Sequence, residues 1–179
     1  LPGIFLEDEI TLKEGHKLLL GMRLDQHQDH GIITTPRAGY KINFDEQILL
    51  RLNAGTGFRV VNIFTEDHAA LTGARDLVID EDLAPEQSYN INLNFYKKSY
   101  TSRGWILGLE AALWHTYFTN QILPDFDTNP NEIRYNNLNG HAVSQGGSLN
   151  IEANYGQFRA QIGASILDVF IKENNQRIR

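Results

Sequence analysis

Imidazole and carboxylate side chains gather in the segment Asp25-Gln26-His27-Gln28-Asp29-His30. Histidine nitrogens and carboxylate oxygens are common ligands of transition metals, so this segment could hold a metal ion. Its spacing matches no helical or hairpin metal motif, and a polar segment of this kind is also typical of a solvated loop. We therefore expect no metal site, and we treat His27 and His30 as loop residues that contact a ligand.

A second polar cluster lies in a long segment of weak strand pattern that follows Arg59. The mixed charges of these connections suit a polar or anionic ligand better than an apolar one. Loops carry recognition when a rigid scaffold positions them, so we expect ligand contact from both connections. The candidate ligand-binding residues are Arg59, Glu66, Asp67, His68, Arg75, His27 and His30.

Signals for catalysis are weak in this chain. Glu7 and Glu9 share one face of a predicted strand, and Glu110 and Glu152 lie on other strands, but nothing in the sequence brings two carboxylates together for hydrolysis. The sequence contains no serine nucleophile elbow, phosphate loop or paired histidine motif. We therefore expect no enzyme, no catalytic residue and no cofactor.

The composition excludes several classes of protein. The chain has 179 residues and no cysteine, which rules out disulfides and Cys-ligated metal centres. Lys and Arg together number 16 against 22 Asp and Glu, a net charge of -6 that argues against nucleic acid as a partner. Every uninterrupted apolar run is far shorter than the ~20 residues of a transmembrane helix.

Alternation of apolar and polar residues runs through almost the whole chain, as expected for strands with two different faces. The clearest example is the segment 87–98, in which Tyr89, Ile91, Leu93 and Phe95 alternate with Ser88, Asn90, Asn92 and Asn94. The pattern predicts an all-β fold, an antiparallel meander of about eight strands. Their expected ranges are 4–12, 17–26, 35–44, 47–58, 87–98, 104–119, 133–155 and 157–170.

Short and long connections alternate along this meander. The expected turns at 13–16, 45–46, 99–103 and 156 are short, whereas 27–34, 59–86 and 120–132 are long. This asymmetry is typical of outer-membrane barrels, whose periplasmic turns are short and whose outside loops are long. Aromatic residues beside the short turns suggest a girdle at one membrane interface: Phe44, Phe95, Trp105, Tyr155 and Phe158.

Several segments resemble those of a known protein family in their residues, in their order and in their separation along the chain. They are Phe5-Leu6-Glu7-Asp8-Glu9-Ile10, Gly21-Met22-Arg23-Leu24-Asp25, Thr35-Pro36-Arg37, Asn53-Ala54-Gly55-Thr56-Gly57-Phe58-Arg59 and Asp82-Leu83-Ala84-Pro85-Glu86-Gln87-Ser88. Together they resemble the C-terminal β-barrel region of TonB-dependent outer-membrane receptors of Gram-negative bacteria. The resemblance extends over nearly the entire chain.

The resemblance implies an architecture and a function. Residues 1–179 would be a partial barrel domain, a fragment of a transmembrane β-barrel of roughly 22 strands, with the plug domain and the remaining strands outside this chain. The implied function is uptake across the cell outer membrane of a metal chelate (siderophore-like), a vitamin or a glycan. The implied partners are a small-molecule or chelate ligand, outer-membrane lipid, and the TonB energy-transducing complex acting through the plug.

Two other architectures fit the strand pattern. A complete eight-stranded outer-membrane barrel would match the expected strand number, because about eight strands enclose an interior that side chains just fill. A soluble β-sandwich with a binding face would also alternate apolar and polar residues. The long connection at 59–86 and the many charged and glycine residues on the polar faces argue against the complete small barrel.

Overall fold

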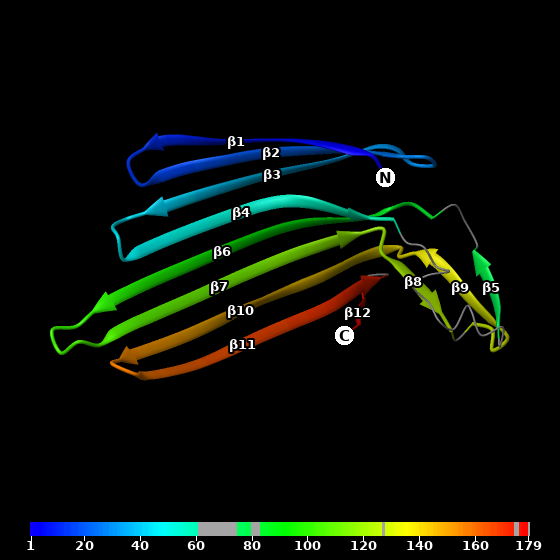
Figure 1. Cartoon of the computed structure of the whole chain (residues 1–179). Helices are drawn as coiled ribbons and strands as arrows, with labels where there is room; N and C mark the ends of the chain where they lie inside the picture. Colours follow the sequence, from blue (N-terminus) through cyan, green and yellow to red (C-terminus); the bar gives the residue numbers. More distant parts are fainter. Residues whose placement is uncertain (61–74, 80–82, 127, 174–175, 179) are drawn as a thin grey trace.

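The computed structural model describes residues 1–60, 75–79, 83–126, 128–173 and 176–178. Within these ranges the regular structure is entirely β. The long strands lie side by side in one curved wall, and a small separate sheet lies beyond one end of them (Figure 1). We call these two parts the wall and the loop sheet.

No helix among the described residues has the length and apolar character needed to cross a membrane.

The wall is one nine-stranded sheet in which every strand pairs with its neighbour in the chain, apart from the loop-sheet strands. All its pairings are antiparallel, so the predicted antiparallel meander is confirmed. Its strands are β1 (Gly3–Lys13), β2 (His16–His27), β3 (Gly31–Asn43), β4 (Ile48–Arg59), β6 (Glu86–Tyr100), β7 (Ile106–Thr119), β10 (Gly140–Tyr155), β11 (Phe158–Glu173) and the short β12 (Gln176–Ile178).

The strand register keeps the predicted faces separate across the wall. Leu93 on β6 lies opposite Leu52 on β4 and Leu113 on β7, and residues directly opposite share a face. Asn92, one position away, lies opposite Asn53 on the other face and accepts a 2.9 Å hydrogen bond from its amide. The apolar face stays uncovered, since Leu113 is 60% exposed. A soluble sandwich would bury that face, so this alternative is wrong.

Two expected element boundaries are wrong. The predicted long connection at 27–34 is a tight turn, because the ladder between β2 and β3 continues to the pair His27 and Gly31. The predicted strand 133–155 is divided into β9 (Glu132–Asn137) and β10, which belong to different sheets. Gly140 begins β10 so close to β11 that a Cβ atom there would lie 2.1 Å from the Lys172 carbonyl oxygen.

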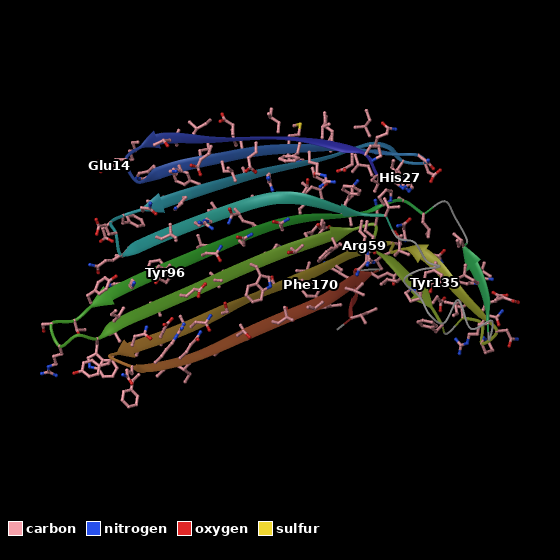
Figure 2. The ribbon with its side chains drawn as sticks, in the orientation of Figure 1. Glu14, His27, Arg59, Tyr96, Tyr135 and Phe170 are labelled. Atoms are coloured by element: carbon pink, nitrogen blue, oxygen red, sulfur yellow. The ribbon has the colours of Figure 1, made fainter. Side chains whose placement is uncertain are left out.

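The loop sheet is built largely from segments that the sequence pattern left as connections, and only its strand at 132–137 overlaps the predicted strand 133–155. Its strands are β5 (Asp76–Ile79), β8 (Ile122–Asp125) and β9, in the order β5-β9-β8, with β5 parallel to β9. Ile122, Ile133 and Tyr135 form a buried core in it, with Leu77 and Leu83 packed against that core. Tyr135 marks this sheet in Figure 2, at the end of the molecule opposite Glu14.

The short turns predicted at 13–16, 45–46, 99–103 and 156 lie at the other end of the wall, whereas the tight turn between β2 and β3 lies at the loop end (Figure 1). Gly15 and Gly156 have φ of 73° and 56° in two of these turns, a backbone conformation that favours glycine. Trp105 stacks on Tyr155 there, with 4.9 Å between the ring centroids. Phe158 beside them is 80% exposed, so the predicted aromatic group presents its rings outward.

Candidate functional site

Strands β3 and β4 pair over only part of their length. Their ladder runs from Asn43 and Leu49 to Arg37 and Gly55 and ends there. Residues 31–36 of β3 still pair with β2, and residues 56–59 of β4 still pair with β6. The two strands therefore part toward the loop end of the wall, and each presents one unpaired edge to the gap between them.

Proline gives this parting a cause in the sequence. Pro36 has no backbone N–H, so a strand edge that needs its donor cannot form there. The ladder to β2 passes through Pro36, opposite Met22, whereas the ladder to β4 ends at the next residue, Arg37. The residue without an N–H donor therefore lies where β3 is no longer paired with β4.

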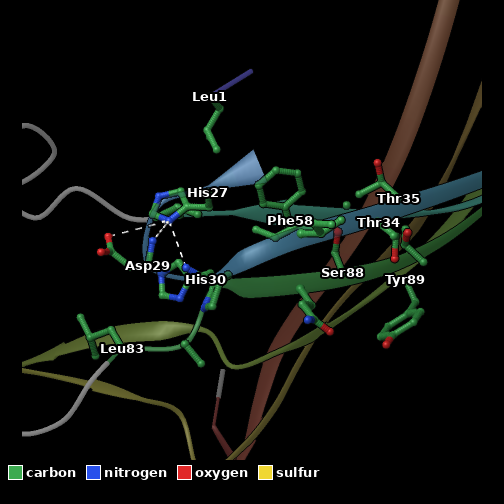
Figure 3. A pocket seen from close by; sticks show the side chains of 18 of the residues that line it. Leu1, His27, Asp29, His30, Thr34, Thr35, Phe58, Leu83, Ser88 and Tyr89 are labelled. Atoms are coloured by element: carbon green, nitrogen blue, oxygen red, sulfur yellow. Dashed lines mark hydrogen bonds and ion pairs between the residues drawn. The ribbon is translucent and has the colours of Figure 1, made fainter. Parts of the chain in front are cut away.

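A cavity of about 1440 Å³ occupies this parting (Figure 3). Side chains from both faces of the sheet line it. The polar lining residues include His27, His30, Thr34, Thr35, Thr56 and Ser88.

Neutral hydrogen-bonding groups dominate the polar part of this cavity. Thr34, Thr56 and Tyr89 contribute hydroxyl groups from the apolar face, and Thr35 and Ser88 contribute hydroxyls from the polar face. None of the described residues that line the cavity is Lys or Arg. The arrangement can bind a ligand through hydroxyl and imidazole groups rather than through positive charge.

The structure brings the predicted His27 and His30 together at the rim of this cavity. Their rings stack with 4.7 Å between centroids (Figure 3). Nδ1 of His27 accepts hydrogen bonds from the backbone N–H groups of Asp29 and His30, at 3.2 and 3.4 Å. This ring nitrogen therefore shapes the turn, and a ligand would meet the remaining ring atoms.

The carboxylate of Asp25 has a different partner. Arg23 donates two hydrogen bonds to it, at 2.8 and 2.7 Å, and Asp25 is only 1% exposed. Among the described residues, no group of three His, Cys, Asp or Glu side chains is arranged to hold a metal ion. The metal hypothesis for segment 25–30 thus gains no support from the geometry.

The predicted Arg59 lies at the junction of the wall and the loop sheet (Figure 2). Its guanidinium donates to Glu86 at 2.7 and 3.1 Å, and the buried Glu86 also accepts a 2.9 Å bond from the backbone N–H of Ile122. Two wall strands and the start of β8 are tied together by these bonds. A role of Arg59 in ligand contact stays a prediction.

The remaining predicted site residues lie in the connection between β4 and β6. Arg75 is described, and its Nη1 donates a 3.4 Å hydrogen bond to the backbone carbonyl of Phe126. Glu66, Asp67 and His68 lie outside the described residues. Their contribution to ligand contact stays a prediction.

Carboxylates on the polar face form ion pairs with cations instead of meeting each other. Glu7 pairs with Arg37, and Glu152 pairs with Arg159 at 3.1 Å. The first contact joins β1 to β3 across β2, and the second joins the neighbouring strands β10 and β11 on that face. They give no support to a pair of carboxylates for hydrolysis.

Sequence reasoning missed the side chain that organises the loop sheet. Asn137 donates to the carbonyl oxygens of Ala84 and Asn120, at 3.0 and 2.7 Å, and accepts a 2.8 Å bond from the N–H of Ala84. It therefore joins both long connections to the end of β9. An Asn among other Asn residues carries no signal of this role, because its partners are distant in sequence.

Comparison with known proteins gives a family for this fold. The family model described as "TonB dependent receptor-like, beta-barrel" matches residues 2–176. The ferric enterobactin receptor PirA of Pseudomonas aeruginosa is 27% identical over 133 residues, which cover 67% of this chain and 17% of that receptor. These relatives are receptors by name, in agreement with the expectation that the chain is not an enzyme.

Solved structures agree on the fold. The FrpB iron transporter of Neisseria meningitidis superposes with a TM-score of 0.76 at 15% identity, over 99% of this chain and 27% of that one. The siderophore receptor PirA of Pseudomonas aeruginosa gives 0.64 at 19% identity, over 94% of this chain and 38% of that one. The chain thus spans well under half the length of the proteins it matches.

Proposed function

The chain belongs to the TonB-dependent receptor family, through its β-barrel domain, and on that premise we propose that it works as part of an outer-membrane active transporter. Members of this family are outer-membrane proteins of Gram-negative bacteria. In this proposal residues 1–179 are one section of a barrel wall with its outside loops. The plug domain and the other strands of a barrel of roughly 22 strands lie elsewhere in the whole receptor.

One observation carries the proposal: the apolar face is continuous and uncovered along the long strands. Ile162 and Ile166 on β11 are 72% and 74% exposed, and Leu113 on β7 shares their face through the register with β10. Such a face is costly in water but stable against lipid hydrocarbon, where the backbone groups of the wall are satisfied by their ladders. The opposite face carries the amides and ion pairs that a water-filled lumen accommodates.

The wall remains open within this chain, since β1 pairs only with β2 in the described structure. A complete eight-stranded barrel would pair its first and last long strands, so this alternative is wrong for the observed sheet. Closure by further strands of the same receptor satisfies the edges that the chain leaves unpaired.

For the transported ligand we propose a metal chelate of the siderophore type. The relatives named as ferric enterobactin receptor and iron transporter support a chelate over the vitamin and the glycan that the sequence also allowed. Energy would come from the TonB complex acting on the plug. The ligand would meet the outside loops first, with His27 and His30 at the cavity and Arg59 and Arg75 beside the loop sheet. Glu66, Asp67 and His68 are further candidates for ligand contact.

The test uses the complete receptor in outer membranes, with a ferric catecholate and a ferric hydroxamate as probes. Replacing both His27 and His30 by Ala should weaken binding of the preferred chelate about tenfold, the effect of roughly 1.4 kcal/mol of lost contacts. The matched control is His16→Ala, because His16 bonds to Tyr40 at the opposite end of the wall. Unchanged binding in the double variant would remove the cavity from the recognition site, and absence of uptake of any chelate by the unaltered receptor would overturn the transporter proposal.

A further inference from the structure

A second cavity lies on the apolar face of the wall. This groove has a volume of about 680 Å³ and crosses strands β1, β2, β3, β4 and β6. Ala38 and Ala54 lie opposite each other on its floor, and both are exposed. Larger side chains stand around them: Leu6, Leu20, Met22 and Tyr89.

The amino-acid sequence explains why the groove forms there. Most outward positions of the wall carry Leu, Ile or aromatic side chains, which fill the surface of a strand. Ala38 and Ala54 place two single methyl groups side by side at the centre of that surface, and Pro36 next to them is short as well. Small side chains between large ones leave a trough with apolar walls.

The groove is continuous with the polar cavity between β3 and β4. Pro36, Thr56 and Tyr89 line both of them. The hydroxyl oxygen of Thr56 is buried and has no hydrogen-bond partner among the described atoms. A buried hydroxyl without a partner costs free energy, and a hydrogen bond to a ligand in the cavity would remove that cost.

We propose that, when no chelate occupies the cavity, this combined site binds one lipid of the outer leaflet, with a sugar head in the cavity and an acyl chain in the groove. The inference rests on the proposed function, because it needs the apolar face to lie in the membrane. An acyl chain is the material that surrounds this face, and most side chains around the alanines of the groove are apolar, with Asp8 of β1 as the acidic exception.

The choice of head follows from the groups around the cavity. Hydroxyl and imidazole side chains hydrogen-bond well to sugar hydroxyls, which act both as donors and as acceptors. An anionic phosphate head would instead call for Arg or Lys. The described lining of the cavity supplies neither, and Arg37, which lines the groove, is paired with Glu7. Tyr89 lies where the head and the chain meet, with an apolar ring and a polar hydroxyl.

The experiment measures lipid retained on the membrane-extracted receptor by native mass spectrometry. The probes are a single-chain glucolipid and lysophosphatidylglycerol with the same acyl chain. We expect one retained glucolipid per receptor and a reduction of about fivefold in Ala54→Trp, whose indole fills the groove. The matched control is Ala164→Trp on β11, an exposed alanine of the same face outside the groove.

A second variant tests the head independently of the chain. Thr56→Val keeps the shape of the side chain and removes the hydroxyl, so glucolipid retention should fall while the receptor stays folded. Equal retention of both probes by the unaltered receptor would overturn the choice of a sugar head. Unchanged retention in Ala54→Trp, or no retained lipid at all, would overturn the site itself; chelate uptake, measured in parallel, reports on the proposed function alone.

Discussion

The wall and the loop sheet differ in whether they bury their apolar side chains. The loop sheet buries its apolar side chains, with Ile133 only 2% exposed, although its strands are short. The wall has long strands but leaves residues such as Ile162 72% exposed on one face. The difference agrees with the proposal that the loop sheet lies in water, whereas the apolar side of the wall lies against lipid.

The most disruptive test of this contrast is the core of the loop sheet. Ile133→Ala should destabilise the loop sheet by about 2–5 kcal/mol, because the truncation leaves a cavity between Ile122 and Tyr135. Hydrogen exchange of the β5, β8 and β9 amides in the purified receptor measures this loss. The control is Ile162→Ala on the wall, which should leave those amides unchanged; equal acceleration in both variants would contradict the separate core.

The wall is tested by placing charge on either of its faces. Ile162→Arg should cost about 2–4 kcal/mol, since a charge near the middle of the lipid-facing band must leave water. Gln161→Arg puts the same side chain on the polar face one residue away and should change stability little. Urea unfolding from liposomes gives both values, and a larger cost for Gln161→Arg would reverse the assignment of the faces.

Removing the hydrogen bonds by which Asn137 joins the two long connections should cause the smallest loss of stability of these tests. Asn137→Ala removes hydrogen bonds to Ala84 and Asn120 and should destabilise the loop sheet by about 1–3 kcal/mol. Exchange at the Ala84 amide reports the change directly. Asn154→Ala is the matched control on the wall, where the side-chain amide of Asn154 donates a hydrogen bond to the nearby Glu152. Protection of Ala84 that survives in Asn137→Ala would assign the joint to other contacts.

The sequence predicts the wall because its signal is local. Alternation over a segment such as 87–98 fixes both the strand and its faces, and β6 follows it from Glu86, directly after Pro85. The loop sheet depends on distant pairing instead. β5 pairs in parallel with β9, which joins Asp76 to Glu132, and strands of four residues are too short to show a period.

The candidate site also has features that the sequence predicts and features that depend on contacts between distant segments. His27 and His30 stand out by residue type, and the structure places both at the cavity. The cavity itself forms because the ladder between β3 and β4 stops at Arg37, next to Pro36. From the sequence alone, a proline does not show which of the two neighbouring strands loses its pairing. Arg59 stands out equally, but its partner Glu86 and the contact of that carboxylate with Ile122 depend on the fold of both connections.

The parting of β3 and β4 also bears on how the wall yields to force and heat. Only seven residue pairs join these two strands, against twelve on either side of them. Among the long strands this ladder is the shortest, and a sheet under tension opens first where the fewest hydrogen bonds break. The wall therefore behaves as two panels, β1 to β3 and β4 onward, joined along a hinge near the short turns.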